Sequence, residues 1–302
     1  MRTIVQTFIM MAIVSIMAMS CSNKSSKNQA QGLDWESEQN IDSLSQTIKF
    51  SNTLFSLPSP YQLTLLVRKS GVSFNSNLLN PIENNQNYTS NFDKCVNLGV
   101  YGADLAYMSI YEQSPLIVSS FSVIKGLSND LDLTSSFNKE LVERIENNVN
   151  NKDSLMSIVS SAYRDMDVYL KETQRQREGA LVLAGGWLES MYILTQLTIE
   201  SKNDALAQRI GESRQPLDNL IKILSPYYHD SQEIEKLLNE LVELADIFAG
   251  VELQYTYVVP EIDAQKKMTI VKSVTKIIIS DDVLNDITKK VNTIRDGIIN
   301  RV

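Results

Sequence analysis

The sequence is poor in the residues that build most metal and redox centres. It holds one histidine and two cysteines in 302 residues, which is too few for a polyhistidine zinc or di-iron centre or for a disulfide-stapled scaffold. It also lacks an excess of positive charge, because 28 lysines and arginines stand against 36 acids and leave a net charge of −8. We therefore expect no metal, no cofactor and no nucleic-acid partner.

Sequence motifs of the common enzyme classes are missing as well. The chain contains no Gly-x-Ser-x-Gly nucleophile elbow, no Walker loop, no Gly-x-Gly-x-x-Gly and no His-Glu-x-x-His. We interpret His229 as a surface or capping residue, because nothing near it in the sequence supplies a nucleophile. Cys95 stands in an apolar periodic stretch and is interpreted as a small core residue.

Residues 1–20 are typical of a secretory signal peptide. Arg2 supplies the positive charge, and an apolar run over residues 8–19 leads to Cys21. This run is shorter than the roughly 20 apolar residues that span a bilayer. We therefore expect the segment to be removed from the mature protein.

A cysteine at this position resembles the lipobox of bacterial lipoproteins. In those proteins the thiol is diacylated and a signal peptidase cuts before it, and Ser20 fits the small residue that precedes the cysteine. The resemblance implies that Cys21 carries palmitate-type acyl chains and anchors the protein on a membrane. Residues 21–33 are then a flexible tether. The alternative is an ordinary signal peptide whose removal leaves Cys21 as a free thiol.

Apolar residues recur at helical spacing through most of the mature chain. The pattern predicts helices over residues 34–56, 61–69, 91–113, 115–130, 137–148, 153–174, 179–200, 203–224 with a bend or break at Pro216, 230–248 and 281–299. Residues 179–200 are apolar nearly all round, with Glu189 as the sole charge before the last position. This predicts a central helix in a protein core rather than in a bilayer, where a mid-span carboxylate is costly.

The apolar period changes from helix to strand after Gly250. Residues 251–259 alternate between apolar and polar side chains, and residues 268–279 are rich in Ile, Val and Thr. We expect a β-hairpin near 251–279, with one face packed on the helices because a lone hairpin is marginally stable. The predicted fold is mainly α: a single domain over residues 34–302, a multi-helix array around a buried apolar helix, with this hairpin before the last helix.

Two of the predicted apolar helices carry a matching polar face. The residues are Asp104, Tyr107 and Tyr111 on the first helix and Glu189, Tyr192 and Gln196 on the second. If the faces meet, Gly102 and the Gly185-Gly186 pair would let the two backbones approach closely while the two carboxyl groups converge.

Three interpretations of this pair of faces stay open. A buried hydrogen-bond network is favoured, because buried polar groups are normally satisfied in this way. The six residues could instead bind a small ligand, or Asp104 and Glu189 could act as an acid and base, one of them with a raised pKa. An open cleft around the carboxyl groups would favour binding or catalysis, and inaccessible carboxyl groups would favour the network.

Four stretches of the sequence resemble a group of uncharacterised bacterial envelope lipoproteins. They are Leu-Pro-Ser-Pro at 57–60, Asn-Leu-Gly-Val-Tyr-Gly-Ala-Asp-Leu at 97–105, Leu-Ala-Gly-Gly-Trp at 183–187 and Gln-Tyr-Thr-Tyr-Val at 254–258. The group has no known activity, so the resemblance implies a location, the lipid-anchored cell envelope and most simply the outer membrane, and no site residue.

The sequence therefore predicts a lipid-anchored envelope protein that binds or scaffolds a protein partner or a small ligand. The alternative is a hydrolase-like envelope enzyme that uses Asp104 and Glu189 between two helices.

Overall fold

The computed structural model describes residues 46–50, 53–57, 66–133, 139–148, 172–263, 268–270 and 273–300, with a few positions between 151 and 168. The chain divides into two units, Met1–Asn40 and Ile41–Val302, and every described residue belongs to the second. The predicted signal peptide, Cys21 and the tether lie outside the described residues.

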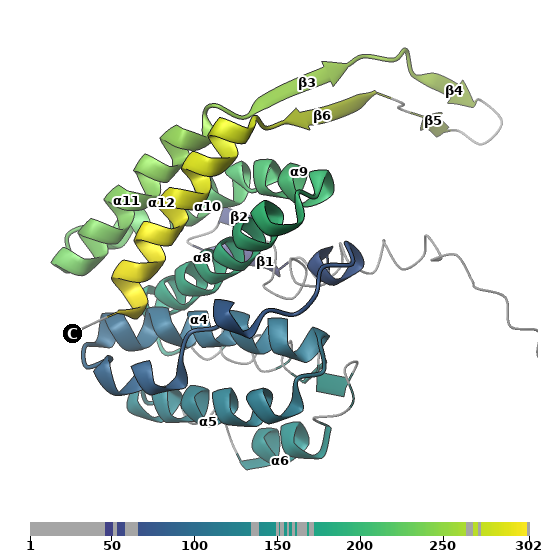
Figure 1. The fold of residues 1–302 in the computed structure, drawn as a ribbon. Coiled ribbons are helices and arrows are strands. Elements are labelled where there is room, and N and C mark those ends of the chain that lie inside the picture. The colour runs from purple at the N-terminus through teal and green to yellow at the C-terminus, as the bar shows by residue number, and fades with distance from the viewer. Residues whose placement is uncertain are drawn as a thin grey trace, which may run out of the picture. The chain divides into compact units, whose positions relative to one another are not determined.

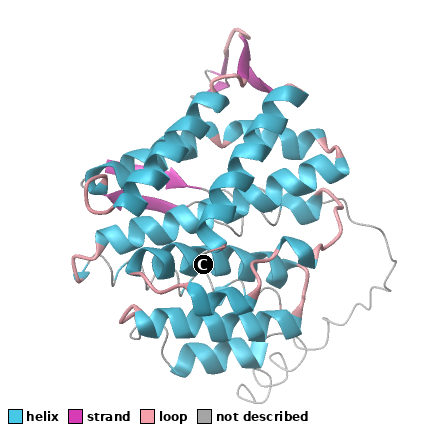
Figure 2. Ribbon diagram, turned by 60° about the vertical axis from the view of Figure 1, so that its left-hand side comes forward, coloured by secondary structure: helices cyan, strands magenta, loops and turns pink. Residues whose placement is uncertain are grey.

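The second unit is mainly helical, as predicted (Figures 1 and 2). Its main helices are α4 (Asn91–Ile110), α5 (Ser114–Asp130), α6 (Lys139–Asn148), α8 (Gln176–Ser201), α9 (Asp204–Glu212), α10 (Arg214–Leu224), α11 (Gln232–Phe248) and α12 (Asp281–Ile299). The described residues also form the short 3-10 turns η1 (Ser76–Leu78), η2 (Ile82–Asn87) and η3 (Ser225–Tyr227). The break predicted at Pro216 lies at Ser213, between α9 and α10. Proline is tolerated in the first turn of a helix, so α10 begins before it.

The apolar helix predicted at the centre is α8, and it packs against α4, α9, α10 and α12. Within the part of the chain that the structure describes, α8 alone is long and apolar enough to cross a membrane, but 83% of its most apolar stretch is buried inside the protein. Neighbours on several sides explain why its apolar residues are not confined to one stripe.

Helices α4 and α8 pack with their backbones in contact. A methyl carbon added to Gly99 would collide with the carbonyl oxygen of Val182, and one added to Gly185 would collide with the carbonyl oxygen of Val96. The predicted close approach is therefore present, and on α4 it occurs at Gly99, one turn before Gly102. A hydrogen in place of a side chain is what allows this separation.

The sequence-based prediction of one helix over residues 34–56 is wrong at its C-terminal end. Strands β1 (Gln46–Phe50) and β2 (Thr53–Leu57) pair there as an antiparallel hairpin, and β2 contacts α10. The segment is rich in β-branched and aromatic residues, which favour strands over the helical spacing on which the prediction relied.

The predicted C-terminal hairpin is present, but its packing differs from the expectation. Strand β3 (Glu252–Thr256) pairs antiparallel with β6 (Val274–Ile278), and further out β4 (Glu261–Asp263) pairs with β5 (Met268–Ile270). We refer to residues 252–278 as the arm.

The expectation that one face of this hairpin packs on the helices is wrong. All five residues of β3 are exposed, and Figures 1 and 2 show the paired strands extending beyond the helices. Contact with the helical body is at the base of the arm, where Ile277 packs next to Gly211 of α9 and Val251. Most of the arm therefore gains no stability from the core.

Candidate functional site

The structure brings together the two polar faces that the sequence predicted. Helices α4 and α8 pack side by side, and Asp104 and Glu189 both face the interior with 1% and 0% of their surface exposed. Solvent does not reach either carboxyl group, so the open cleft that would favour catalysis is not found around them.

Glu189 is paired with a residue that the sequence analysis did not consider. Arg295 of α12 donates from Nε to Glu189 Oε2 at 2.6 Å and from Nη2 to Oε1 at 2.7 Å, a bidentate ion pair. Arg295 Nη2 also donates to the carbonyl oxygen of Leu78 at 2.9 Å, and the guanidinium lies 3.8 Å from the centre of the Tyr192 ring. Three segments of the chain, α8, α12 and η1, thus meet at one cation.

Arg295 keeps its charge despite its burial. Burial alone would lower the pKa of Arg295, but the adjacent Glu189 carboxylate outweighs burial and raises it. Arg295 is 5% exposed, so its charge is balanced by Glu189 rather than by water.

Asp104 lies beside the same ion pair, and its surroundings favour the protonated form of its carboxyl group. Its Oδ2 accepts the backbone N–H of Asn80 at 2.9 Å, whereas Oδ1 has no donor within reach. Burial raises the pKa of Asp104 well above its usual value, and so do the negative charge of Glu189 and a hydrogen bond to the Glu189 side chain, although Arg295 and the Asn80 N–H act in the opposite direction. In its protonated form Asp104 can donate to the Glu189 carboxylate, and the two carboxyl groups can then share one proton.

The remaining residues of the two faces use their polar atoms to hold other segments. The Tyr107 hydroxyl accepts the backbone N–H of Asn75 at 2.9 Å, and the Tyr111 hydroxyl donates to the carbonyl oxygen of Val72 at 2.6 Å. Gln196 donates to an asparagine side chain of α12 at 2.8 Å. Tyr192 lies under Arg295 as described above. The structure therefore brings these residues into one region, where they tie together α4, α8, α12 and the loop before α4.

Further polar residues extend this network, and the sequence analysis missed them. Asn97 Nδ2 donates to the carbonyl oxygen of Ile298 at 3.2 Å, and the Tyr88 hydroxyl donates to that of Ile299 at 3.1 Å. Asn80 Nδ2 donates to the Tyr88 hydroxyl at 3.0 Å. These contacts satisfy carbonyl groups in the last turn of α12, which have no partner within their own helix.

The sequence does contain a signal for Arg295. The buried side of α12 carries Ile287, Val291, Ile294 and Ile298, and Arg295 follows Val291 by four residues, which places it on the same face. A single arginine in an apolar stripe predicts a buried acidic partner. Which acid is that partner depends on a contact between two residues 106 positions apart in the sequence. Local spacing does not reveal such a contact.

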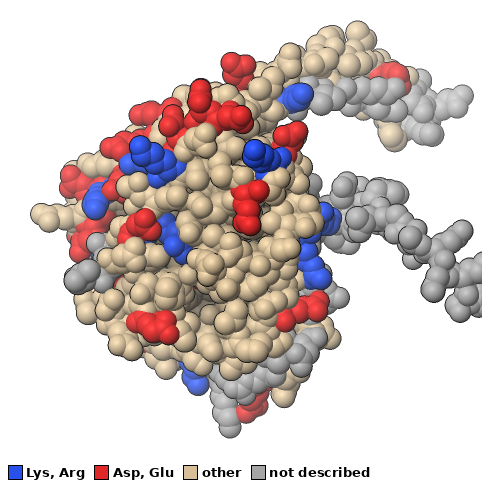
Figure 3. All heavy atoms as spheres, in the orientation of Figure 1, with Lys and Arg blue, Asp and Glu red and all other residues tan. Residues whose placement is uncertain are grey.

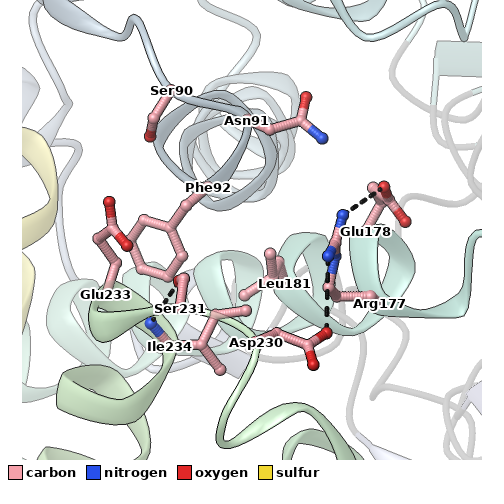
Figure 4. Close-up of a pocket in the computed structure, with 10 residues that line it drawn as sticks. All are labelled: Ser90, Asn91, Phe92, Arg177, Glu178, Leu181, Asp230, Ser231, Glu233 and Ile234. Atoms are coloured by element: carbon pink, nitrogen blue, oxygen red, sulfur yellow. Dashed lines mark hydrogen bonds and ion pairs between the residues drawn. The ribbon is translucent and has the colours of Figure 1, made fainter.

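An open pocket lies elsewhere, where the first turns of α4, α8 and α11 meet (Figure 4). The space in and above it measures about 530 Å³, and it is lined by Ser90, Asn91, Phe92, Arg177, Glu178, Leu181, Asp230, Ser231, Glu233 and Ile234. Phe92, Leu181 and Ile234 are buried and form the apolar part of its wall.

The charged side chains Arg177, Glu178 and Asp230 at the rim of this pocket form ion pairs with one another. Arg177 lies 3.3 Å from a carboxylate oxygen of Glu178 and 3.5 Å from one of Asp230, as Figure 4 shows. Asp230 takes part in this ion pair, and Ser231 caps α11. The pocket therefore combines an apolar wall with a rim of paired charges.

Comparison with known proteins adds no relative: no family model, no curated protein and no solved structure matches this chain. Among the described residues, no three His, Cys, Asp or Glu side chains lie close enough together to hold a metal ion. Any function must therefore be argued from the geometry of the chain itself.

Proposed function

We propose that this protein is a lipid-anchored component of a bacterial cell envelope that binds a protein partner through its arm and catalyses no reaction. The observation that carries the proposal is the exposed apolar surface of the arm. Among the described residues, eight of the fourteen large apolar side chains found exposed belong to it: Leu253, Tyr255, Tyr257, Val258, Val259, Ile262, Met268 and Ile278. Concentrated exposed apolar surface is typical of interaction sites.

The inaccessible carboxyl groups support a role without catalysis. A general acid or base must come within hydrogen-bond distance of its substrate, but Asp104, Glu189 and Arg295 are at most 5% exposed. Both oxygens of Glu189 are taken by Arg295. The arrangement is that of a structural network, which makes the core specific rather than reactive.

The N-terminal sequence supports the envelope location. The apolar segment that ends in Ser20 and Cys21 resembles a lipobox, and two or three acyl chains are enough for stable anchoring. The polar stretch after Cys21 gives a tether between the acyl chains and the folded unit.

Anchoring is tested by fractionation of the full-length chain in a bacterial host that processes lipoproteins. The wild type should be found in the membrane fraction with an acylated N-terminal cysteine, and Cys21→Ser should leave the protein unprocessed or release it. A fully soluble wild type with an unmodified N-terminus would overturn this part of the proposal.

Binding through the arm is tested with a photo-crosslinking amino acid placed at position 257. The matched control places it at position 118 on α5, where the valine is 44% exposed but lies outside the arm. We expect a covalent protein adduct from position 257 and none from position 118. No adduct from position 257, or equal adducts from both positions, would overturn the proposal.

A further inference from the structure

A short segment before α4 covers the buried charges of the core. Residues 72–81, which we refer to as the strap, run along α4 in the opposite direction (Figure 1). Leu78 and Asn80 of the strap are buried, whereas the residues beside them at positions 76, 77 and 81 are exposed. The strap is therefore a single layer of chain between the buried ion pair and solvent. Charged side chains are visible on the surface of the helices in Figure 3, but those of the ion pair are inside.

The strap is held mainly through its backbone, by side chains spaced along α4. Tyr111 binds the carbonyl oxygen of Val72 at 2.6 Å, Tyr107 the N–H of Asn75 at 2.9 Å, Asp104 the N–H of Asn80 at 2.9 Å, and Tyr101 the carbonyl oxygen of Pro81 at 2.8 Å. In the strap, whose residues are all described, only Leu78 among the apolar side chains is fully buried. A segment with so few buried apolar contacts opens at a lower free energy than the helices beneath it.

Opening of the strap changes the surroundings of Asp104. Its Oδ2 exchanges the Asn80 N–H for water, and Arg295 Nη2 exchanges the Leu78 carbonyl oxygen for water. Under the closed strap, burial and the charge of Glu189 raise the pKa of Asp104. Contact with water returns the pKa toward the ordinary value of about 3.9. At a pH between these two values, opening therefore releases one proton to the solvent.

The other titratable groups around Asp104 do not compete for this role. They are Glu189 and Tyr192 of α8, Arg295 of α12, and Tyr101 and Tyr107 of α4, while the strap contributes the backbone N–H of Asn80. Burial raises the pKa of all three tyrosines, that of Tyr107 to about 12, so these phenols stay neutral near pH 7. Both oxygens of Glu189 are held by Arg295.

We propose that the strap is a pH-linked lid, which opens when Asp104 gives its proton to the solvent and then admits water to the Glu189–Arg295 pair. The inference goes beyond the proposed function and depends neither on the arm nor on the anchor. Because opening releases one proton, each pH unit raises the ratio of open to closed strap about tenfold, until the pH reaches the raised pKa of the closed form. The closed strap is thus most stable at low pH.

Hydrogen exchange of the full-length protein, read by mass spectrometry on a fragment that spans the strap, tests this proposal. Asp104→Asn keeps an acceptor for the Asn80 N–H and removes the titrating group. The ratio of the exchange rate in the wild type to that in Asp104→Asn should rise about tenfold from pH 5 to pH 6. Intrinsic exchange rates and all other titrating groups are common to the two proteins and cancel from this ratio.

Tyr107→Phe is the matched control, because it removes the hydroxyl that accepts the Asn75 N–H and leaves Asp104 in place. It should speed exchange of the strap by a factor of about 3 to 10 at every pH and keep the same increase with pH as the wild type. A ratio of wild type to Asp104→Asn that does not change with pH would overturn the pH link. Equal protection of the strap and of α11 in the wild type would overturn the lid, since the strap would then open only when the whole protein unfolds.

Discussion

Replacement of Asp104 by asparagine should stabilise the protein, and the gain should increase with pH. Asparagine stays neutral in the folded and unfolded states. Its side-chain oxygen can accept the Asn80 N–H that Asp104 now accepts at 2.9 Å, and its amide nitrogen can donate to Glu189 as the protonated carboxyl group does. The Asp104→Asn substitution therefore keeps the hydrogen bonds of this side chain and removes its titratable group.

The magnitude follows from the direction of the pKa shift. Burial and the Glu189 charge raise the pKa of Asp104 in the folded state, whereas the unfolded chain titrates near the ordinary value of about 3.9. Between the two pKa values the folded state holds one more proton, so this carboxyl group reduces the free energy of unfolding by about 1.4 kcal/mol for each pH unit. Its stabilising contribution is complete below the unfolded pKa and is lost as pH rises toward the folded pKa.

Urea unfolding at pH 4.5, 5.0 and 5.5 measures this difference directly. The free energy of unfolding of Asp104→Asn relative to the wild type should grow by about 1.4 kcal/mol over that range. Asp286→Asn is the matched control, since Asp286 is an exposed residue of α12 and its replacement leaves the network intact. A difference between Asp104→Asn and wild type that stays constant with pH would refute the shared proton, because Asp104 would then be ionised in the folded protein.

Three further predictions concern the core. Gly99→Ala and Gly185→Ala should each lower the free energy of unfolding by about 3 kcal/mol or more, because a methyl group would push α4 and α8 apart. Chemical denaturation measures this change, and a loss under about 1 kcal/mol would show that the helices separate easily. Arg295→Met should lower the free energy of unfolding by about 3–5 kcal/mol, because it leaves Glu189 buried without its counter-ion. Adding Glu189→Leu to this variant should restore part of the lost stability. If the losses of the two single variants simply add in the double variant, the ion pair is contradicted. Burial raises the pKa of Cys95 to about 12, so a thiol reagent at pH 8 should label Cys95 only after unfolding, and rapid labelling of the native protein would show that the helix face is accessible.

Apolar periodicity predicted the helices well, because the apolar residues of each helix mark the face that the helix buries. The stretch from Asn91 to Ile110 and the apolar helix around Glu189 could be placed from local spacing alone. The same spacing placed Asp104 and Glu189 each on a polar helix face and left open whether the two faces meet, and the structure shows that α4 and α8 pack against each other. Local spacing could not supply Arg295, because an ion pair across 106 positions depends on how α12 docks.

The two hairpins show a different limit of sequence-based prediction. Tyr255 and Tyr257 alternate with polar residues, a pattern typical of a strand with one buried face, yet they are 61% and 64% exposed. Alternation shows that one face is suited to burial, and it does not say whether the covering surface belongs to the same chain. At residues 46–57 strand propensity and helical spacing conflicted, and pairing of two neighbouring segments decided in favour of strands.

The position of Arg295 in the last helix sets an order of events during synthesis. A growing chain presents Asp104 and Glu189 long before the cation that neutralises them emerges from the ribosome. Until α12 docks, closing α8 into a dry core would leave the Glu189 carboxylate uncompensated, at a cost of several kcal/mol. We therefore expect the α4–α8 pair to pack loosely in an incomplete or C-terminally clipped chain and to become fixed when Arg295 reaches Glu189 and the Leu78 carbonyl.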